Sequence, residues 1–235
     1  MYLTRFRVNT ARTGARRLLS SPQSLHAAVK SSFAQAPQEP TGREPRVLWR
    51  LDYNANADVV LYIVSPDRPD LTHLVEQAGW PTTGGWETFS YAPLLDRIAV
   101  GDTWAFRLTA NPVHSIRRKE GEPTKHTAHM TPRHQMGWLI KHQGAAGFNV
   151  VEKPMERRVL DSGDEYELVV HNRRGLAFGK NDQRTDEKLN VTLAAATFDG
   201  RLRVTDADAM RRTLTAGLGR AKAYGCGLMT LAPVS

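Results

Sequence analysis

His26 and Lys30 are the two side chains in this sequence whose types and spacing best suit acid–base chemistry. Residues four positions apart share one side of a helix, so a helix through this segment places a cation beside the imidazole. An imidazole has a reference pKa of about 6.5, so both protonation states are available near neutral pH. A positioned acid or base contributes about 10²–10⁴-fold to a rate, and an ammonium group stabilises developing negative charge. A lone helical histidine is more often packed or solvated, so these residues alone assign no role.

The most specific pattern is a glycine-rich segment near the C-terminus, GLGRAKAYGCGL over residues 217–228. Its glycines permit positive φ angles and close approach of another backbone, and successive amides in such a turn can bind phosphate. It is neither a Walker A loop nor a dinucleotide-binding fingerprint, because the required spacings are absent. A structural loop that ends a helix is the alternative. The candidate residues are Gly217, Gly219, Arg220, Lys222, Gly225 and Gly227.

The positive charge is unevenly distributed along the chain. The net charge is +8 and the sequence pI is about 9.9, above the value of about 9 that is typical of nucleic-acid-binding domains. Residues 1–50 contain nine Lys or Arg and two Asp or Glu, whereas residues 51–100 contain two and seven. This asymmetry favours a basic surface for a polyanion, with ordinary solubilising charge as the alternative. The candidate contacts are Arg16, Arg17, Arg117, Arg118, Lys119, Lys125, Arg157, Arg158, Arg173, Arg174, Lys180 and Arg184.

The composition excludes several classes of protein. The single cysteine, Cys226, excludes internal disulfides and multi-cysteine metal sites. Four histidines cluster over residues 126–142 without the spacing of a helical ligand pair, so we predict no metal site and no small-molecule cofactor. There is no apolar run of about 18 residues and no secretory signal, which predicts a cytoplasmic protein without a membrane partner.

The first half of the chain predicts strands interleaved with helices. Alternating residues predict a strand over Tyr2–Asn9, followed by an irregular basic stretch over residues 10–20. Ser21 and Pro22 are typical of a helix start. Further predictions are strands over 47–52 and 59–64 that could form a hairpin, a short helix over 71–79, and a strand over 103–108.

The second half repeats this mixture. Residues 116–131 are predicted to form a loop or hairpin tip before a long helix over 131–144. Two strands are predicted next, over 148–151 and 166–170, followed by a charged excursion over 172–188. A strand over 189–198 then leads into a hairpin turn at Asp199-Gly200. The last predicted elements are a helix capped by Asp206 and a strand over 228–231. A strand and then a helix begin each half, which suits an α+β fold of two tandem ferredoxin-like domains, residues 1–112 and 113–235, each an antiparallel sheet with helices on one face.

Short segments in order along the chain resemble CasE (also called Cse3), the CRISPR repeat endoribonucleases of type I-E systems within the RAMP superfamily. These segments are Leu3-Thr-Arg5, Pro22-Gln-Ser-Leu-His26, Leu48-Trp-Arg-Leu51, Phe106-Arg-Leu-Thr-Ala-Asn-Pro112, Thr131-Pro132 with Trp138-Leu139, Phe198-Asp-Gly-Arg-Leu202 and the glycine-rich segment. The resemblance implies two ferredoxin-like (RRM-like) domains. It also implies metal-independent cleavage of precursor CRISPR RNA beside the repeat stem-loop, followed by retention of the product within Cascade with its other subunits.

The resemblance also implies roles for residues of the first helix. It places the catalytic histidine at His26, with attack by an RNA 2′-hydroxyl giving a 2′,3′-cyclic phosphate and a 5′-hydroxyl. Thermophilic-type members carry a tyrosine three residues earlier, where this chain has Gln23, which cannot act as an acid and would orient a phosphate or ribose. Lys30, or Arg16 or Arg17, would be the assisting cation. The alternatives are a non-catalytic RNA-binding scaffold of the same fold and an unrelated basic RNA-binding protein.

Overall fold

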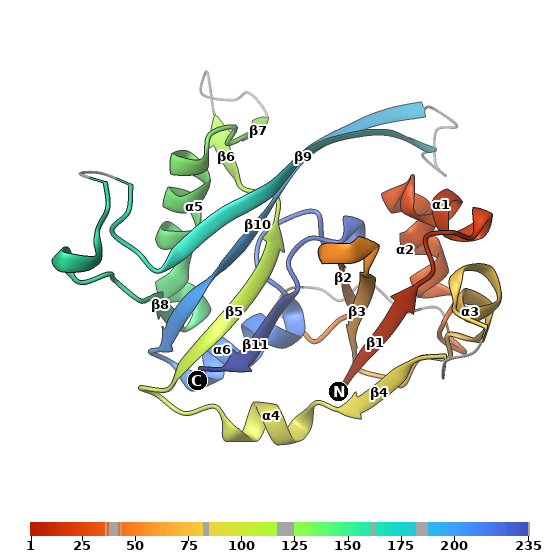
Figure 1. The fold of residues 1–235 in the computed structure, drawn as a ribbon, viewed down its shortest axis with the longest axis horizontal. Helices are drawn as coiled ribbons and strands as arrows, with labels where there is room; N and C mark the ends of the chain where they lie inside the picture. The colour runs from red at the N-terminus through yellow and green to blue at the C-terminus, as the bar shows by residue number, and fades with distance from the viewer. Residues whose placement is uncertain are drawn as a thin grey trace.

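The protein folds into two antiparallel sheets, one from each half of the chain (Figure 1). The computed structural model describes residues 1–35, 37, 42, 44–81, 85–116, 125–160, 163–181 and 188–234. The N-terminal half lies on the right of Figure 1 and the C-terminal half on the left, with both chain ends at the bottom. Among the described residues, the helices are too short or too polar to cross a bilayer.

The first sheet has the strand order β2-β3-β1-β4. Three short helices accompany it, and their apolar side chains form one core with the sheet around Phe6, Leu25, Val29, Leu61 and Leu74. The elements are β1 (Tyr2–Val8), α1 (Thr13–Leu19), α2 (Pro22–Lys30), β2 (Leu48–Tyr53), a 3-10 turn η1 (Ala55–Ala57), β3 (Val59–Ser65), α3 (Thr72–Ala78) and β4 (Glu87–Ser90).

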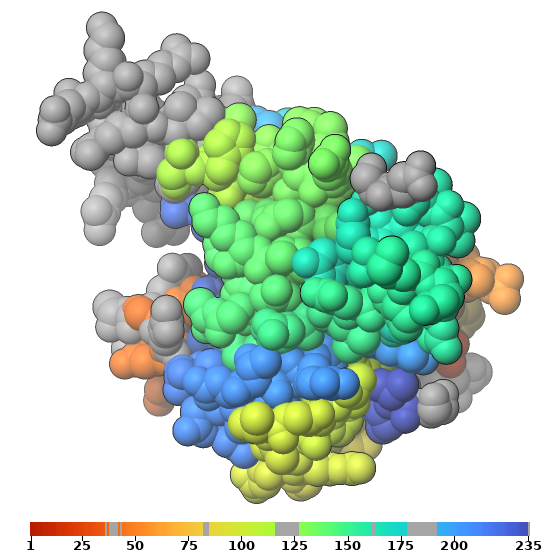
Figure 2. All heavy atoms as spheres, turned by 90° about the vertical axis from the view of Figure 1, so that its left-hand side faces the viewer, coloured from red at the N-terminus to blue at the C-terminus, as the bar shows by residue number. Residues whose placement is uncertain are grey.

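The second sheet has the order β11-β5-β10-β8, and β9 pairs with β10. Figure 2 shows the face of this half on which α5 lies above α6, with α4 at the bottom. The elements are α4 (Ala92–Arg97), β5 (Thr103–Ala110), the hairpin β6 (Val113–Ile116) and β7 (Lys125–Ala128), α5 (Pro132–Ala146), β8 (Phe148–Val150), η2 (Met155–Arg157), β9 (Leu168–Asn181), β10 (Lys188–Val204), α6 (Ala207–Ala216), η3 (Lys222–Tyr224) and β11 (Met229–Pro233).

Both sheets follow one plan, which confirms the α+β prediction. When the additional strand β9 is left out of the second sheet, the first strand of each sheet lies between the third and the fourth, and the second strand is at an edge beside the third. This order is that of a ferredoxin-like domain. The division at residue 112 would assign β5 to the first domain, whereas β5 pairs with β10 and β11 of the second sheet. We therefore propose that the second domain begins before β5.

Helices with side-chain caps lie where the sequence predicts them. The hydroxyl of Ser21 accepts a hydrogen bond from the amide of Ser24 at the start of α2. Thr131 caps α5 and Asp206 caps α6 in the same way. A capping side chain satisfies one of the amides that a helix N-terminus leaves without a partner. The predicted hairpin of β2 and β3 is also confirmed, with Tyr53 opposite Val59.

Three predictions of local structure are wrong, and two elements were not predicted. Residues 10–20 are not irregular, because α1 occupies most of them. The excursion over 172–188 is wrong up to residue 181, because β9 continues to Asn181. Asp199-Gly200 is not a turn, since β10 passes straight through it, and Gly200 pairs with Phe106 on β5 and Leu168 on β9. A Cβ on this residue would collide with the carbonyl of Glu167, so the glycine serves close strand packing. Finally, β4 and α4 were not predicted.

Arg50 of β2 joins the two sheets. Its side chain is buried, with 1% of the residue exposed. Nη1 donates to the carbonyl oxygens of Arg107 (2.8 Å) and Leu228 (3.1 Å), and Nη2 donates to Oγ1 of Thr230 (2.8 Å). Because these acceptors lie on or beside β5 and β11, one side chain of the first half hydrogen-bonds to the second half at three points.

Candidate active site

The helix α2 holds His26 at the edge of its buried face. Leu25 and Val29 of the same helix are buried in the first core, whereas the His26 side chain is half-buried. The ring of His26 lies beside the ring of Tyr224, with centroids 6.5 Å apart and planes tilted by 59°. Such a tilted arrangement is favourable for two aromatic rings. Since Tyr224 belongs to the glycine-rich segment, the structure brings the two strongest sequence motifs together across the two halves.

The glycine-rich segment is fixed by its own backbone. Gly217, Gly219, Gly225 and Gly227 all have positive φ angles. A Cβ on Gly225 would lie 2.6 Å from the Trp49 ring, so only glycine allows the segment to pack this closely on β2.

Backbone hydrogen bonds also limit what this segment can bind. The amide of Leu218 donates to the carbonyl of Gly227, and the amide of Gly227 donates to that of Thr109. The amide of Tyr224 donates to the carbonyl of Ala221. These three amides are therefore engaged within the protein, and phosphate binding by the other amides of the segment stays a prediction. The segment also holds Tyr224 beside α2.

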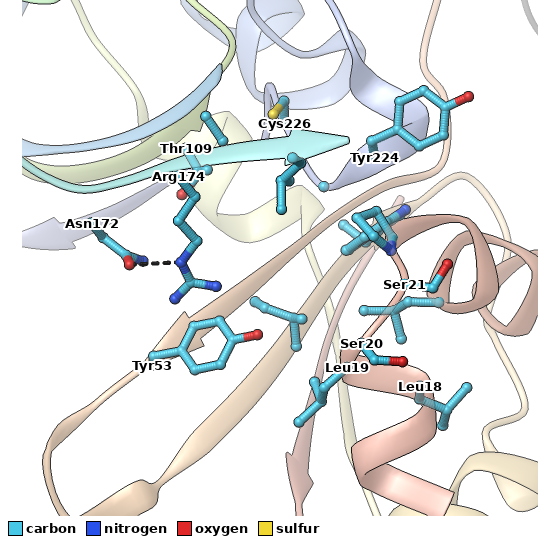
Figure 3. Close-up of a pocket in the computed structure, with 17 residues that line it drawn as sticks. Leu18, Leu19, Ser20, Ser21, Tyr53, Thr109, Asn172, Arg174, Tyr224 and Cys226 are labelled. Carbon is cyan, nitrogen blue, oxygen red and sulfur yellow. Dashed lines mark hydrogen bonds between the residues drawn. The ribbon is translucent and has the colours of Figure 1, made fainter. Parts of the chain in front are cut away.

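Tyr224 is the residue of this site that sequence reasoning missed. The available signal was an aromatic side chain within a run of glycines and cations. Its hydroxyl end points away from the neighbouring pocket in Figure 3. The helix α2 and the turn η3 are in contact, as are β2 and η3.

The other predicted residues of the first helix lie close by. Gln23 and Lys30 are half-buried and stand three and four positions from His26, on the same side of α2. Arg16 and Arg17 are exposed on α1, which packs against α2. This side of α2 therefore offers an imidazole, an amide and an ammonium group to one ligand, with two further cations on the neighbouring helix.

The cations of the glycine-rich segment differ in environment. Arg220 is exposed and its backbone forms an isolated bridge to Asn111 of the β5 end. Lys222 is half-buried, and burial, followed by the charge of Arg46, holds the pKa of its ammonium group below the usual value. It lines a pocket of about 210 Å³ with His142 and Arg212 on the helical side of the second domain. Arg220 is not among the residues that line this pocket.

The remaining predicted cations are dispersed. Arg173 and Arg174 are consecutive on β9 and point apart, Arg173 toward the carbonyl of Met130 and Arg174 over the ring of Tyr53. Arg157 and Arg158 lie at η2, at the opposite end of the long axis from α2 (Figure 1). For Lys125 and Lys180 only the backbone is described, in β7 and β9. Outside the described residues lie Arg117, Arg118, Lys119 and Arg184.

A pocket of about 100 Å³ lies between the two halves (Figure 3). We call it the interdomain pocket. Tyr224, whose ring lies beside that of His26, is one of its lining residues. Its walls come from the α1–α2 junction, from β2, and from β9, β10 and the glycine-rich segment. The lining residues are Leu18, Leu19, Ser20, Ser21, Pro22, Leu25, Trp49, Leu51, Tyr53, Thr109, Asn172, Arg174, Leu176, Ala195, Tyr224, Gly225 and Cys226.

Three histidine rings lie in a row near the β6–β7 hairpin, with one tilted and one stacked pair. His114 and His129 have ring centroids 4.6 Å apart, and His129 and His134 5.9 Å apart. Burial, followed by the charges of His114, His134 and Lys141, lowers the pKa of His129. Across the residues that the structure describes, no three His, Cys, Asp or Glu side chains are grouped as metal ligands.

Comparison with known proteins decides the family. Residues 1–233 match the sequence family described as "CRISPR associated protein". The CRISPR-associated endoribonuclease Cse3 of Thermus thermophilus is 30% identical over 234 residues, covering 99% of this chain and 100% of that protein. The chain belongs to the Cse3/CasE family of CRISPR-associated endoribonucleases.

Two further comparisons agree with membership of the Cse3/CasE family. The Cascade subunit CasE of Escherichia coli (strain K12) is 26% identical over 200 residues, covering 80% of this chain and 89% of that protein. A solved structure of T. thermophilus Cse3 bound to an RNA representing a pre-cleavage complex has a TM-score of 0.70 at 26% identity, covering 99% and 98% of the two chains. The resemblance inferred from the sequence segments is therefore confirmed.

Proposed function

We propose that this Cse3/CasE-family chain binds the stem-loop of a CRISPR repeat RNA and cleaves precursor CRISPR RNA at one phosphodiester. The observation that carries the proposal is the half-buried ring of His26, held on a capped helix and facing Tyr224 of the glycine-rich segment. The T. thermophilus relative is named an endoribonuclease and its solved structure holds RNA, which supports an RNA substrate here.

The proposed reaction uses the nucleophile that RNA itself supplies. The 2′-oxygen forms a bond to the adjacent phosphorus while the bond from phosphorus to the 5′-oxygen breaks. One proton leaves the 2′-hydroxyl and another joins the 5′-oxygen, so the products are a 2′,3′-cyclic phosphate and a 5′-hydroxyl. His26 performs one of these two transfers, because its imidazole can donate or accept a proton near neutral pH. No metal ion takes part in this proposal.

The neighbours of His26 act on the phosphate in this scheme. The ammonium group of Lys30 stabilises the additional negative charge of the five-coordinate transition state. The side-chain amide of Gln23 donates a hydrogen bond that orients a phosphate or ribose oxygen, since an amide cannot supply a proton. The ring of Tyr224 holds the imidazole at the edge of α2, so that it keeps one orientation toward the ribose.

Cations on both halves of the chain would hold the RNA backbone. A-form RNA is recognised largely through its shape, its phosphates and its 2′-hydroxyls. Arg16 and Arg17 on α1 are exposed close to α2 and can contact phosphates beside the cleaved bond. We further propose that the cleaved RNA stays bound and joins the other Cascade subunits, because the E. coli relative is named a Cascade subunit.

The decisive experiment uses the purified chain, a repeat hairpin RNA and EDTA. We expect one cut, a cyclic phosphate at the new 3′ end, and loss of cleavage in His26→Ala with hairpin affinity unchanged. Cleavage that persists in His26→Ala would disprove the role of this histidine. Tight binding without cleavage by the wild-type protein would show a non-catalytic scaffold. Cleavage only after addition of a divalent metal would overturn the metal-independent mechanism.

A further inference from the structure

The strand β9 contains a bulge where it passes the interdomain pocket. Its register with β10 shifts between His171 and Arg174, so that Asn172 and Arg173 stand opposite the single residue Ala196. Asn172 has a φ angle of 47°, which side-chain-bearing residues rarely adopt. Bulges redirect side chains, and such backbone conformations cluster at binding sites. The distortion therefore points to a binding role for this part of β9.

The bulge places a planar cation over an aromatic ring at the pocket. The guanidinium carbon of Arg174 lies 4.0 Å from the centroid of the Tyr53 ring, within the range of a cation–π contact. Nε of Arg174 donates to Oδ1 of Asn172 at 2.9 Å. Figure 3 shows Arg174 reaching from β9 toward Tyr53 of the other half of the chain, with Asn172 beside it. This bond fixes the plane of the guanidinium group.

The rest of the pocket is mostly apolar, with Ser20, Ser21 and Thr109 as further polar lining residues, and it adjoins the candidate cleavage site. Leu51 and Leu176 face it from the two sheets, and Leu25 faces it from the residue before His26. Tyr224 both lines the pocket and contacts the His26 ring. A nucleotide whose phosphate lies at His26 therefore has this pocket within reach of its base.

We infer that the interdomain pocket binds one unpaired nucleobase of the RNA, next to the cleaved phosphodiester. The base stacks on the guanidinium plane of Arg174 and on the apolar wall, and Asn172 hydrogen-bonds to its edge. The inference rests on the proposed function and deepens it, because a pocket of this kind makes cleavage depend on the identity of a base outside the stem.

A nucleobase fits these observations better than the other candidates. Proteins recognise unpaired bases by stacking them on aromatic rings or arginine planes and hydrogen-bonding to their edges. A phosphate alone would not need the apolar wall, and an apolar protein segment would not need the Arg174–Asn172 pair. The pocket is also too small for a duplex, so the occupant is a base turned out of the helix.

The test is a set of abasic substitutions in the hairpin RNA, one at each nucleotide flanking the cut. Single-turnover cleavage and the affinity of a 2′-deoxy, uncleavable version are measured with wild-type protein and with Arg174→Ala. We expect one abasic position to weaken binding or cleavage by about 5- to 100-fold in the wild type, the range for loss of one base stack. The same substitution should have no further effect in Arg174→Ala.

Two variants serve as matched controls. Arg173→Ala removes a cation one residue away that points to the other side of the strand, so any loss should be equal for every RNA. Arg174→Lys keeps the charge without the planar group and should behave as Arg174→Ala.

Three outcomes would overturn the inference. One is full recovery in Arg174→Lys, and another is an abasic effect of equal size in the wild type and in Arg174→Ala. The third is unchanged RNA behaviour in Arg174→Ala with loss of binding to other Cascade subunits, because the pocket would then receive a protein. All three leave the proposed function intact as long as His26→Ala fails to cleave the unmodified hairpin.

Discussion

Arg50 donates hydrogen bonds from Nε and Nη2 to the two carboxylate oxygens of Asp52, at 2.6 and 2.9 Å. The side chains are only 2% and 7% exposed, so the pair is buried at the junction of the two sheets. A buried ion pair adds little net stability, but removing one partner leaves a charge without compensation. The junction therefore depends on both members of the pair.

We expect Asp52→Ala to lower the free energy of unfolding by about 3–5 kcal/mol, the usual cost of breaking a buried pair. Denaturant unfolding of the full chain measures this. Glu87→Ala is the matched control, because Glu87 pairs with Arg5 on the surface, where the side chains are 53% and 47% exposed. That change should cost at most about 1 kcal/mol. Equal effects of the two substitutions would contradict the prediction.

Replacing Tyr224 should slow cleavage more than it weakens RNA binding. The ring contact with His26 holds the imidazole, and a catalytic group misplaced by about 1 Å can cost on the order of 10²-fold in rate. We therefore predict a loss of about 10- to 100-fold in single-turnover cleavage for Tyr224→Ala, whereas Tyr224→Phe, which keeps the ring, stays within about threefold. Tyr166→Phe serves as the control, because this tyrosine belongs neither to the His26 contact nor to the interdomain pocket. Equal losses for Tyr224→Ala and Tyr224→Phe would assign the role to the hydroxyl instead.

Two glycine-to-alanine substitutions should act in opposite directions. Gly225→Ala places a Cβ at 2.6 Å from the Trp49 ring in a residue with a φ angle of 78°. We expect it to lower stability by about 1–3 kcal/mol. Gly144→Ala, in α5 with no atom within 4 Å of the new Cβ, should raise stability by about 0.5–1 kcal/mol. Thermal unfolding of both variants measures the difference, and a stable Gly225→Ala would show that the segment can move away from β2.

Acid should weaken the protein partly through Asp199. Burial acts to raise the pKa of this carboxyl. The hydrogen bonds and charges of Arg107 and His171 together lower the pKa by more than burial raises it, so the pKa lies below its usual 3.8. A carboxyl whose pKa is lower in the folded state than in the unfolded state stabilises the folded state at pH values above the unfolded pKa. This contribution disappears as pH falls below about 4. Asp199→Asn should therefore narrow the difference in Tm between pH 7 and pH 3. An unchanged difference would mean that other carboxyls dominate the acid transition.

Affinity for the uncleavable hairpin should fall steeply with salt. Each phosphate neutralised by a cation releases counterions, with a slope of about −0.7 to −0.9 in log affinity against log salt. A loss of about tenfold or more between 50 and 200 mM salt is expected, measured by fluorescence anisotropy or filter binding. A flat response would contradict the cationic surface inferred from the net charge of +8.

The parts of the fold that the sequence predicted are those with local signals. The side-chain caps of α2, α5 and α6 are all recognisable from adjacent residues. By contrast, α1 has no side-chain cap, and its helical form depends on packing that buries Ala15 completely between neighbouring helices. No local pattern indicates such a contact, so the sequence alone predicts an irregular segment here.

The course of β10 was mispredicted for a related reason. Asp199-Gly200 is a strong turn signal on its own. In the protein, strands pair with both sides of this segment, and the side chain of Asp199 receives hydrogen bonds from Arg107. Tertiary pairing therefore outweighs the local preference.

In the candidate site, too, the sequence predicts the residues with a local signal and not those placed by tertiary contacts. His26, Gln23 and Lys30 were found because they lie on one short helix within a recognisable motif. Tyr224 and Asn172 were missed, because one contacts the helix only after the chain has folded and the other depends on a bulge in a strand pair. The orientation of Arg174 toward Tyr53 was equally beyond prediction from the sequence.

The only cysteine of the chain lines the interdomain pocket and is fully buried, so that burial raises the pKa of the Cys226 thiol to about 12. A thiol in that state reacts very slowly with alkylating reagents, since the thiolate is the reactive form. Its rate of modification therefore reports how often this wall of the interdomain pocket opens, because Cys226 packs against Leu193 and Ala195 there. The alkylation rate of Cys226 in the native protein therefore measures opening of the pocket. RNA bound across the pocket should lower this rate.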